Sequence, residues 1–173
     1  MRRTLAIMGA LVLASANGAS AQMAAPVCTQ GKAVLPPELA AWSSAIPKKA
    51  ARDAKTIAAA ELTPGQAVTA ALVQTVDLHY VVRPEKPAGS VSYGGLFRFG
   101  VKEAGTYRVA LGSGAWIDVL MGKTALVSIA HGHGPECSDI RKMVDFSLKP
   151  GRYVLQIAAN GSDSLPLLVT RVP

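Results

Sequence analysis

A short segment in the C-terminal half of the chain gathers side chains that can bind metal or transfer protons. It reads His131-Gly-His133-Gly-Pro-Glu136-Cys137 and contains two of the three histidines and one of the two cysteines. In an extended piece of chain, a His-x-His pair places both imidazoles on the same side. Two imidazoles and a carboxylate suit iron, zinc or copper. The segment therefore predicts a divalent-metal site at His131, His133 and Glu136, with His79 as a reserve ligand.

The same segment also has a simpler interpretation. Its glycines and proline are typical of a loop or a strand end, and histidines in a surface loop can face water without binding anything. His79 stands in an alternating stretch between Leu78 and Tyr80, which is typical of a partly buried structural histidine in a strand. The residues alone leave both interpretations open.

The spacing of His131, His133 and Glu136 resembles part of the first cupin motif, in which a His-x-His pair is followed by a glutamate. The gap to Glu136 is one residue shorter than in cupins, and no histidine occurs between Pro150 and Gly161, where the second cupin motif would stand. The resemblance implies an alternative function, a mononuclear non-haem iron dioxygenase of the homogentisate dioxygenase kind that holds iron with these three side chains. The chain has no Gly-x-Ser-x-Gly nucleophile elbow.

The first 21 residues are typical of a secretory signal peptide. Arg2 and Arg3 form the positively charged start, residues 5–14 are mostly apolar, and residues 19–21 are a small-residue cleavage site. We therefore expect a periplasmic or secreted bacterial protein. No later apolar run approaches the roughly 20 residues that a membrane-spanning helix needs.

The two cysteines, Cys28 and Cys137, form the only possible intramolecular pair. An exported protein folds in an oxidising compartment, where a disulfide is favoured over a cysteine and histidine metal site. We predict this disulfide, which would tie the N-terminal segment beside the histidine-containing segment.

Basic residues outnumber acidic ones, 18 to 11, and the formal net charge is +7. The basic residues are scattered and are not interleaved with aromatic residues as in nucleic-acid-binding motifs. For an exported chain, this excludes nucleic acid as a partner. The charge instead suits attraction to an anionic envelope component, and a small ligand is the other expected partner.

From residue 62 onward, the sequence is typical of an all-β domain. Short runs of Val, Ile, Leu, Tyr and Phe alternate with Gly and Pro turns, without intervening helices. This predicts a single β-sandwich or jelly roll of about eight or nine antiparallel strands over residues 62–173. Because Pro166 lacks an amide donor, the last strand is expected at a sheet edge. The expected strands cover 66–74, 77–83, 90–100, 106–112, 115–121, 124–131, 140–148, 152–159 and 165–172.

Residues 22–61 are expected to form an N-terminal arm. Pro36-Pro37 can start a short helix that continues through Trp42 and ends before Pro47. The alanine-rich stretch from Lys48 to Glu61 lacks a broad apolar stripe, which predicts a weak helix or a linker.

Two stretches of the predicted β domain echo one another. Residues 99–111 and 146–157 each contain a strand, a glycine turn and a second strand that begins with Gly-x-Tyr, at Tyr107 and Tyr153. This sequence pattern resembles that of the jelly-roll accessory domains of secreted bacterial proteins, such as the pre-peptidase C-terminal domains. The resemblance implies a binding or stabilising module.

Trp116 and Asp118 lie on the same face of a predicted strand. An aromatic ring that stacks on a sugar and a carboxylate that accepts hydroxyl hydrogen bonds could form a carbohydrate-binding surface, together with basic residues such as Arg98 and Lys102. The competing interpretation places Trp116 in the core, because the chain has few aromatic residues to fill it.

Together, these observations predict an exported, non-catalytic binding or structural module that can capture a divalent metal through His131 and His133. The cupin-like dioxygenase and a carbohydrate- or envelope-binding module are the alternatives.

Overall fold

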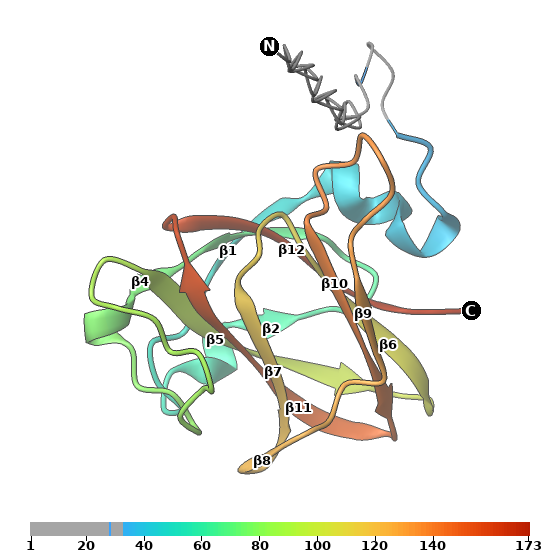
Figure 1. The fold of residues 1–173 in the computed structure, drawn as a ribbon. Helices are drawn as coiled ribbons and strands as arrows, with labels where there is room; N and C mark the ends of the chain where they lie inside the picture. Colours follow the sequence, from blue (N-terminus) through green and yellow to red (C-terminus); the bar gives the residue numbers. More distant parts are fainter. Residues whose placement is uncertain (1–27, 29–32) are drawn as a thin grey trace, which may run out of the picture.

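The computed structural model describes residue 28 and residues 33–173 (Figure 1). The predicted signal peptide and the first part of the arm lie outside the described residues. In chain order, the described elements are η1 (Pro37–Ser44), β1 (Ile46–Lys49), η2 (Ile57–Ala59), β2 (Glu61–Leu62), β3 (Val68–Ala71), β4 (Val73–Gln74), η3 (Thr75–Asp77), β5 (Tyr93–Val101), β6 (Gly105–Leu111), β7 (Trp116–Met121), β8 (Thr124–Ala125), β9 (Ala130–Gly132), β10 (Lys142–Leu148), β11 (Gly151–Asn160) and β12 (Ser164–Arg171), where η marks a 3-10 helix.

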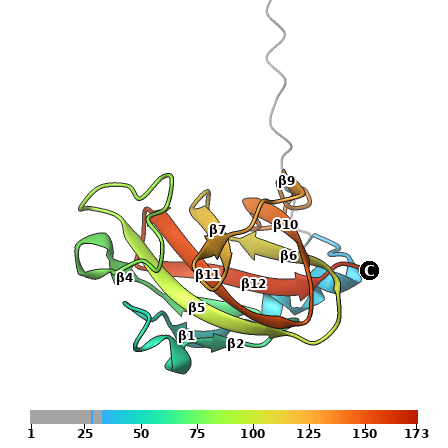
Figure 2. The same ribbon diagram turned by 90° about the horizontal axis from the view of Figure 1, so that it is seen from below.

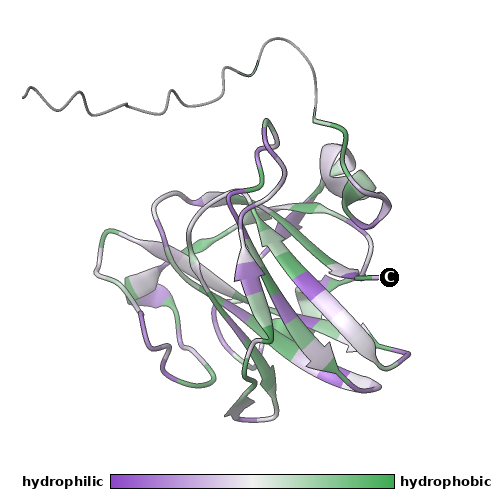
Figure 3. Ribbon diagram, turned by 45° about the vertical axis from the view of Figure 1, so that its right-hand side comes forward, coloured by the Kyte–Doolittle hydropathy of each residue, from purple (hydrophilic) through white to green (hydrophobic). Residues whose placement is uncertain are grey.

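The strands form two sheets that pack face to face, which confirms the predicted all-β sandwich (Figures 1 and 2). Sheet A has the order β1-β3-β12-β6-β10-β9, and sheet B has the order β2-β5-β11-β7-β8, with β4 beside β5. Alternate residues of the long strands point inward, as the period of two requires. Apolar residues run along these strands (Figure 3), and Phe97, Phe99, Leu155 and Ile157 are among the fully buried side chains between the sheets.

Part of the expected arm belongs to the sandwich. β1 pairs in parallel with β3 at one edge of sheet A, and β2 pairs in parallel with β5 at one edge of sheet B. The other strand pairs are antiparallel. β1 and β2 contain four and two residues, which is too short for an alternating pattern to stand out. The expected helix before Pro47 exists as the 3-10 helix η1.

Three predicted strands differ from the structure. The segment 66–74 is divided into β3, which pairs in sheet A, and β4, which pairs with β5 of sheet B. The segment 77–83 forms no strand. A side chain of β11 binds the backbone of Val81 and Val82, and His79 N donates a hydrogen bond to the carbonyl of Arg52. The segment 124–131 is divided into β8 and β9, which pair with β7 of sheet B and with β10 of sheet A. The chain therefore crosses from one sheet to the other between residues 125 and 130.

The predicted edge position of Pro166 is also wrong, because β12 lies between β3 and β6. The register with β6 starts one residue later, at Leu167 opposite Leu111. The carbonyl of Pro166 accepts a hydrogen bond from Gly112 N at 3.0 Å, just beyond the end of β6. A Cβ on Gly112 would lie 3.0 Å from the proline ring, so a glycine at this position lets an interior strand accommodate a proline.

The two Gly-x-Tyr stretches have the same structure. Each connects strands of different sheets, β5 to β6 and β10 to β11. The hydroxyl of Tyr107 donates a hydrogen bond to the carbonyl of Glu103 at 3.1 Å, and that of Tyr153 donates to the carbonyl of Lys149 at 2.8 Å. In both corners, a buried tyrosine closes the turn by bonding to the backbone four residues upstream.

Irregular segments cover the outer faces of both sheets. η1 covers sheet A and completes a second, small apolar cluster of Leu39, Ala67, Ala110, Ile140 and Leu168. The segment 75–92 covers part of sheet B, and Leu78 packs there with the main core. The candidate sites lie beside these two segments, η1 on sheet A and residues 75–92 on sheet B.

Candidate functional site

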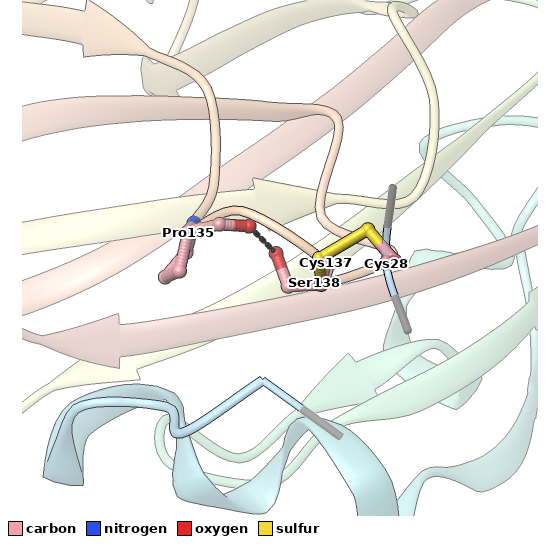
Figure 4. Close-up of a disulfide and its surroundings, with 4 residues drawn as sticks. All are labelled: Cys28, Pro135, Cys137 and Ser138. Carbon is pink, nitrogen blue, oxygen red and sulfur yellow. Dashed lines mark hydrogen bonds between the residues drawn. A yellow bond between two sulfur atoms is a disulfide. The ribbon is translucent and has the colours of Figure 1, made fainter. Parts of the chain in front are cut away.

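The predicted disulfide between Cys28 and Cys137 is confirmed, and it joins the N-terminal segment to the loop between β9 and β10 (Figure 4). The two Cα atoms are 5.4 Å apart. Cys137 has a left-handed backbone, with a φ of 59°, and Ser138 Oγ donates a hydrogen bond to the carbonyl of Pro135 at 2.6 Å. The loop is therefore a tight turn that is covalently attached to a segment 109 residues away.

Gly134 packs this loop onto the outer apolar cluster. Its amide donates a hydrogen bond to the carbonyl of Ile140 at 3.2 Å, and a Cβ at Gly134 would collide with the side chain and carbonyl of Ile140. Nothing lies within 4 Å of the Cβ position at Gly132. Of these two glycines between the predicted ligands, one is thus required by packing.

The predicted metal ligands are all exposed. His131 is the middle residue of β9, and Glu136 lies in the β9–β10 loop. His133 Nδ1 donates a hydrogen bond to the carbonyl of Arg141 at 2.9 Å, because a carbonyl only accepts. In a neutral imidazole, this bond leaves Nε2 as the nitrogen that can bind a metal.

His79 is exposed, not partly buried in a strand as expected, because its segment crosses the outside of sheet B. Among residues 28 and 33–173, no three His, Cys, Asp or Glu residues are grouped so that they could hold a metal ion. The described part of the chain thus supplies no third ligand for His131 and His133. The metal site and the iron dioxygenase that it would support stay predictions.

A groove of about 500 Å³ lies between η1, the residues just before it and the β9–β10 loop that carries Cys137, called the disulfide loop below. Its apolar wall includes Leu35 and the indole of Trp42, both of which also pack against the outer cluster of sheet A. Its polar lining residues are Ser43, Thr69, Ser138 and Asp139, and the remaining lining residues are Ala33, Ala40, Ala45, Cys137 and Pro166. Its described lining residues come from four separate stretches of chain, so no local sequence motif could predict this groove.

An ion-pair network holds η1 against sheet A. Arg108 on β6 donates hydrogen bonds to both carboxylate oxygens of Asp145, each at 2.8 Å. Glu38 of η1 lies 3.6 Å from the same guanidinium group. The hydrogen bonds to Asp145 and the two negative charges raise the pKa of Arg108. Sequence analysis missed these residues, because 37 residues separate Arg108 from Asp145 and nothing local links them.

On sheet B, Gln156 fastens the covering segment. This side chain is fully buried on β11. Its Oε1 accepts hydrogen bonds from Val81 N at 2.7 Å and Val82 N at 3.2 Å, and its Nε2 donates to Val82 O at 3.1 Å. The side chain of Gln156 thus supplies the backbone of Val81 and Val82 with hydrogen-bond partners that a neighbouring strand would otherwise supply. A Cβ at Gly94 would collide with Tyr80 and Leu78 of the covering segment, so a glycine there permits the close approach.

Trp116 and Asp118 lie beside Gln156, on the outer face of sheet B. The indole Nε1 donates a hydrogen bond to Asp118 Oδ1 at 2.9 Å. The ammonium groups of Lys86 and Lys142 lie 5.4 Å and 5.6 Å from the centre of the ring, within reach of cation–π attraction. The competing interpretation, a core position of Trp116, is not borne out, because the residue is only partly buried and belongs to neither apolar cluster. A sugar would have to displace the lysines to stack on it, and the carbohydrate site stays a prediction.

Burial changes the protonation of this cluster. It raises the pKa of Asp118, and the nearby negative charge of Glu85 raises it further, whereas hydrogen bonds from Trp116 and Gln156 lower it. Burial lowers the pKa of Lys142, and the positive charge of Lys86 lowers it further. The cluster therefore favours the neutral forms of both groups more than water does.

In the part of the chain that the structure describes, no helix is long and apolar enough to cross a membrane. No protein-family model matches the chain, and no curated protein is significantly similar to it.

Proposed function

We propose that this chain is an exported, non-catalytic β-sandwich protein that binds a small ligand in the groove between η1 and the disulfide loop. The periplasm or the extracellular space is the proposed location, because disulfides such as Cys28–Cys137 persist in oxidising compartments. The signal-like start of the sequence supports the same location.

The groove is the observation that carries the proposal. Its volume of about 500 Å³ falls in the usual range of small-molecule sites, roughly 300–1,000 Å³. It also combines an apolar wall with a few polar groups, which is the usual composition of such sites. Trp42 supplies a large apolar surface, and Thr69 and Ser138 supply hydroxyl groups.

The groove is held in shape from several sides. The disulfide fixes the loop that carries Ser138, and the Glu38–Arg108–Asp145 network fixes η1, which carries Trp42. A site whose walls are fixed in advance loses less entropy when a ligand binds. The same bonds that stabilise the fold thus favour binding here.

The proposal can be tested by filling the groove. Ala45 lines it and is exposed, so Ala45→Trp should occupy the groove without disturbing the core. With 1-hexanol as the probe, NMR titration of the unmodified protein should shift the indole N–H of Trp42 and the amides of Thr69 and Ser138. Ala45→Trp should abolish these shifts.

Ala54→Trp is the matched control, because Ala54 is exposed in a turn and does not line the groove. It should leave the titration unchanged. The proposal fails if hexanol shifts none of the groove resonances, or if the shifts survive in Ala45→Trp.

A further inference from the structure

The charge of the residues that line the groove favours one class of ligand. Among the described residues that line it, Asp139 alone carries a charge and Trp42 alone is aromatic. The remaining lining residues are apolar or neutral polar groups. The groove therefore offers an apolar wall and one negative charge.

This negative charge contrasts with the chain as a whole, whose formal net charge is +7. A positively charged protein repels cations at long range. Among the described residues that line the groove, however, the carboxylate of Asp139 is the charge that a ligand meets. Charge interactions beyond a Debye length of about 8 Å are largely screened at physiological ionic strength. The local carboxylate can therefore outweigh the net charge for a ligand that is already in the groove.

Asp139 is also free to interact with a ligand. Its side chain is exposed, and the hydrogen bonds that fix its loop come from its neighbours, Ser138 Oγ to Pro135 O and Gly134 N to Ile140 O. The disulfide at Cys137 holds the carboxylate two residues away on the rim of the groove. A ligand would therefore meet a carboxylate on a backbone that is already fixed.

We propose that the groove binds a small amphiphilic cation, a molecule with a short apolar part and an ammonium group. Its apolar part packs against Trp42 and Pro166, and its ammonium group pairs with Asp139. This inference rests on the proposed function, since it names the ligand class of the same groove. A neutral amphiphile can use only the apolar wall, and an anionic one is repelled by Asp139.

Three probes with the same hexyl chain test the proposal: hexyltrimethylammonium, 1-hexanol and hexanesulfonate. NMR titrations that follow the Trp42 indole N–H should rank their affinities in that order. An exposed ion pair contributes up to about 1 kcal/mol, which corresponds to about fivefold in affinity. Asp139→Asn should therefore weaken the cation about fivefold and leave hexanol nearly unchanged.

Asp77→Asn serves as the matched control, because Asp77 is an exposed carboxylate that does not line the groove. It should leave all three affinities unchanged. Because surface ion pairs are screened by salt, raising sodium chloride from about 0.05 M to about 0.5 M should also weaken the cation and not hexanol in the unmodified protein. This second measurement requires no variant.

The outcomes separate the two proposals. If the three probes bind the groove alike, or if Asp139→Asn weakens all of them equally, the cation inference is overturned while ligand binding in the groove stands. If hexyltrimethylammonium shifts residues elsewhere and not Trp42, the cation inference is also overturned. If none of the probes shifts the groove resonances, both proposals fail.

Discussion

The outer faces of the two sheets are both covered by irregular chain, but the coverings are held in different ways. On sheet A, the outer apolar cluster and an ion-pair network hold η1, a disulfide holds the loop between β9 and β10, and a groove lies between the two pieces. On sheet B, the buried Gln156 binds the backbone of the covering segment directly. The difference indicates that two pieces of chain held separately can leave a groove between them, whereas one continuous segment bound by a side chain of the sheet is closed onto it.

Removal of the disulfide should have the largest effect on this comparison. For a loop of more than 100 residues, the chain-entropy model gives about 4–5 kcal/mol of stabilisation through the unfolded state. We expect Cys28→Ala/Cys137→Ala to lower the free energy of unfolding by about 4 kcal/mol, measured by urea denaturation. Ligand binding in the groove should be lost as well, since the loop is no longer fixed.

Amide hydrogen exchange can locate this effect. In the double variant, the amides of η1, such as Leu39, should exchange faster than the global unfolding equilibrium requires. The amides of Val81 and Val82 should exchange only through global unfolding. Equal local acceleration on both sheets would contradict the idea that the two coverings are held independently.

Replacement of Gln156 should have the next largest effect, on the opposite face. Gln156→Leu leaves the amides of Val81 and Val82 and the carbonyl of Val82 without their partner, and a buried unsatisfied group costs about 1–3 kcal/mol. We expect a loss of about 3 kcal/mol in urea denaturation, because water can reach some of these groups once the segment loosens.

The exposed Gln74 provides the matched control, and Gln74→Leu should change stability by less than about 0.5 kcal/mol. Gln156→Leu should leave hexanol binding in the groove unchanged. A loss of groove binding in Gln156→Leu would show that the two faces are coupled through the core.

Gly134→Ala should have a smaller effect, confined to the sheet A side. The new Cβ collides with Ile140, and overpacking of this kind costs about 1–3 kcal/mol. Gly132→Ala is the control, because its Cβ would meet open space. Urea denaturation of the two variants should therefore differ, and equal stabilities would mean that the loop yields without cost.

The sequence predicts the features of this fold that depend on pattern or counting. The sandwich follows from alternating strands, the disulfide from the presence of just two cysteines, and the two corners from the repeated Gly-x-Tyr. The segment 77–83 resembles a strand in sequence because its residues alternate, but in the structure the backbone groups of Val81 and Val82 have an outside partner other than a strand. That partner is the side chain of Gln156, and a single glutamine inside an apolar strand carries no signal of what it binds.

The candidate site was harder to predict for a physical reason. The His131–Cys137 segment stands out because its residue types are rare in this chain, but rarity does not bring a third ligand into place. The groove consists of common residues such as alanine, serine and threonine from four stretches of chain. Its only distinctive members, Trp42 and Asp139, are nearly a hundred residues apart in the printed sequence.

The protonation of Asp118 offers a smaller test on the sheet B side. Its pKa is raised by burial above the ordinary value of 3.8, so the folded state holds a proton more tightly than the unfolded state. Between 3.8 and the raised value, this contribution stabilises the fold as pH falls. On acidification from neutral pH to this window, the unmodified protein should therefore gain stability relative to Asp118→Asn.

Urea denaturation of both proteins at a series of pH values measures this difference. A stability difference between the unmodified protein and Asp118→Asn that stays constant with pH would contradict the raised pKa. Groove binding of hexanol should not depend on Asp118 at any pH.

The smallest effect is expected from the two histidines that first attract attention. His131→Ala/His133→Ala removes two exposed imidazoles and one hydrogen bond to Arg141, so the free energy of unfolding should change by less than about 0.5 kcal/mol. Thermal unfolding with and without zinc then tests the metal site, because a ligand that binds only the folded state raises the melting temperature. If zinc stabilises the unmodified protein and not the double variant, the imidazoles bind metal. If zinc stabilises neither, the predicted metal site is wrong.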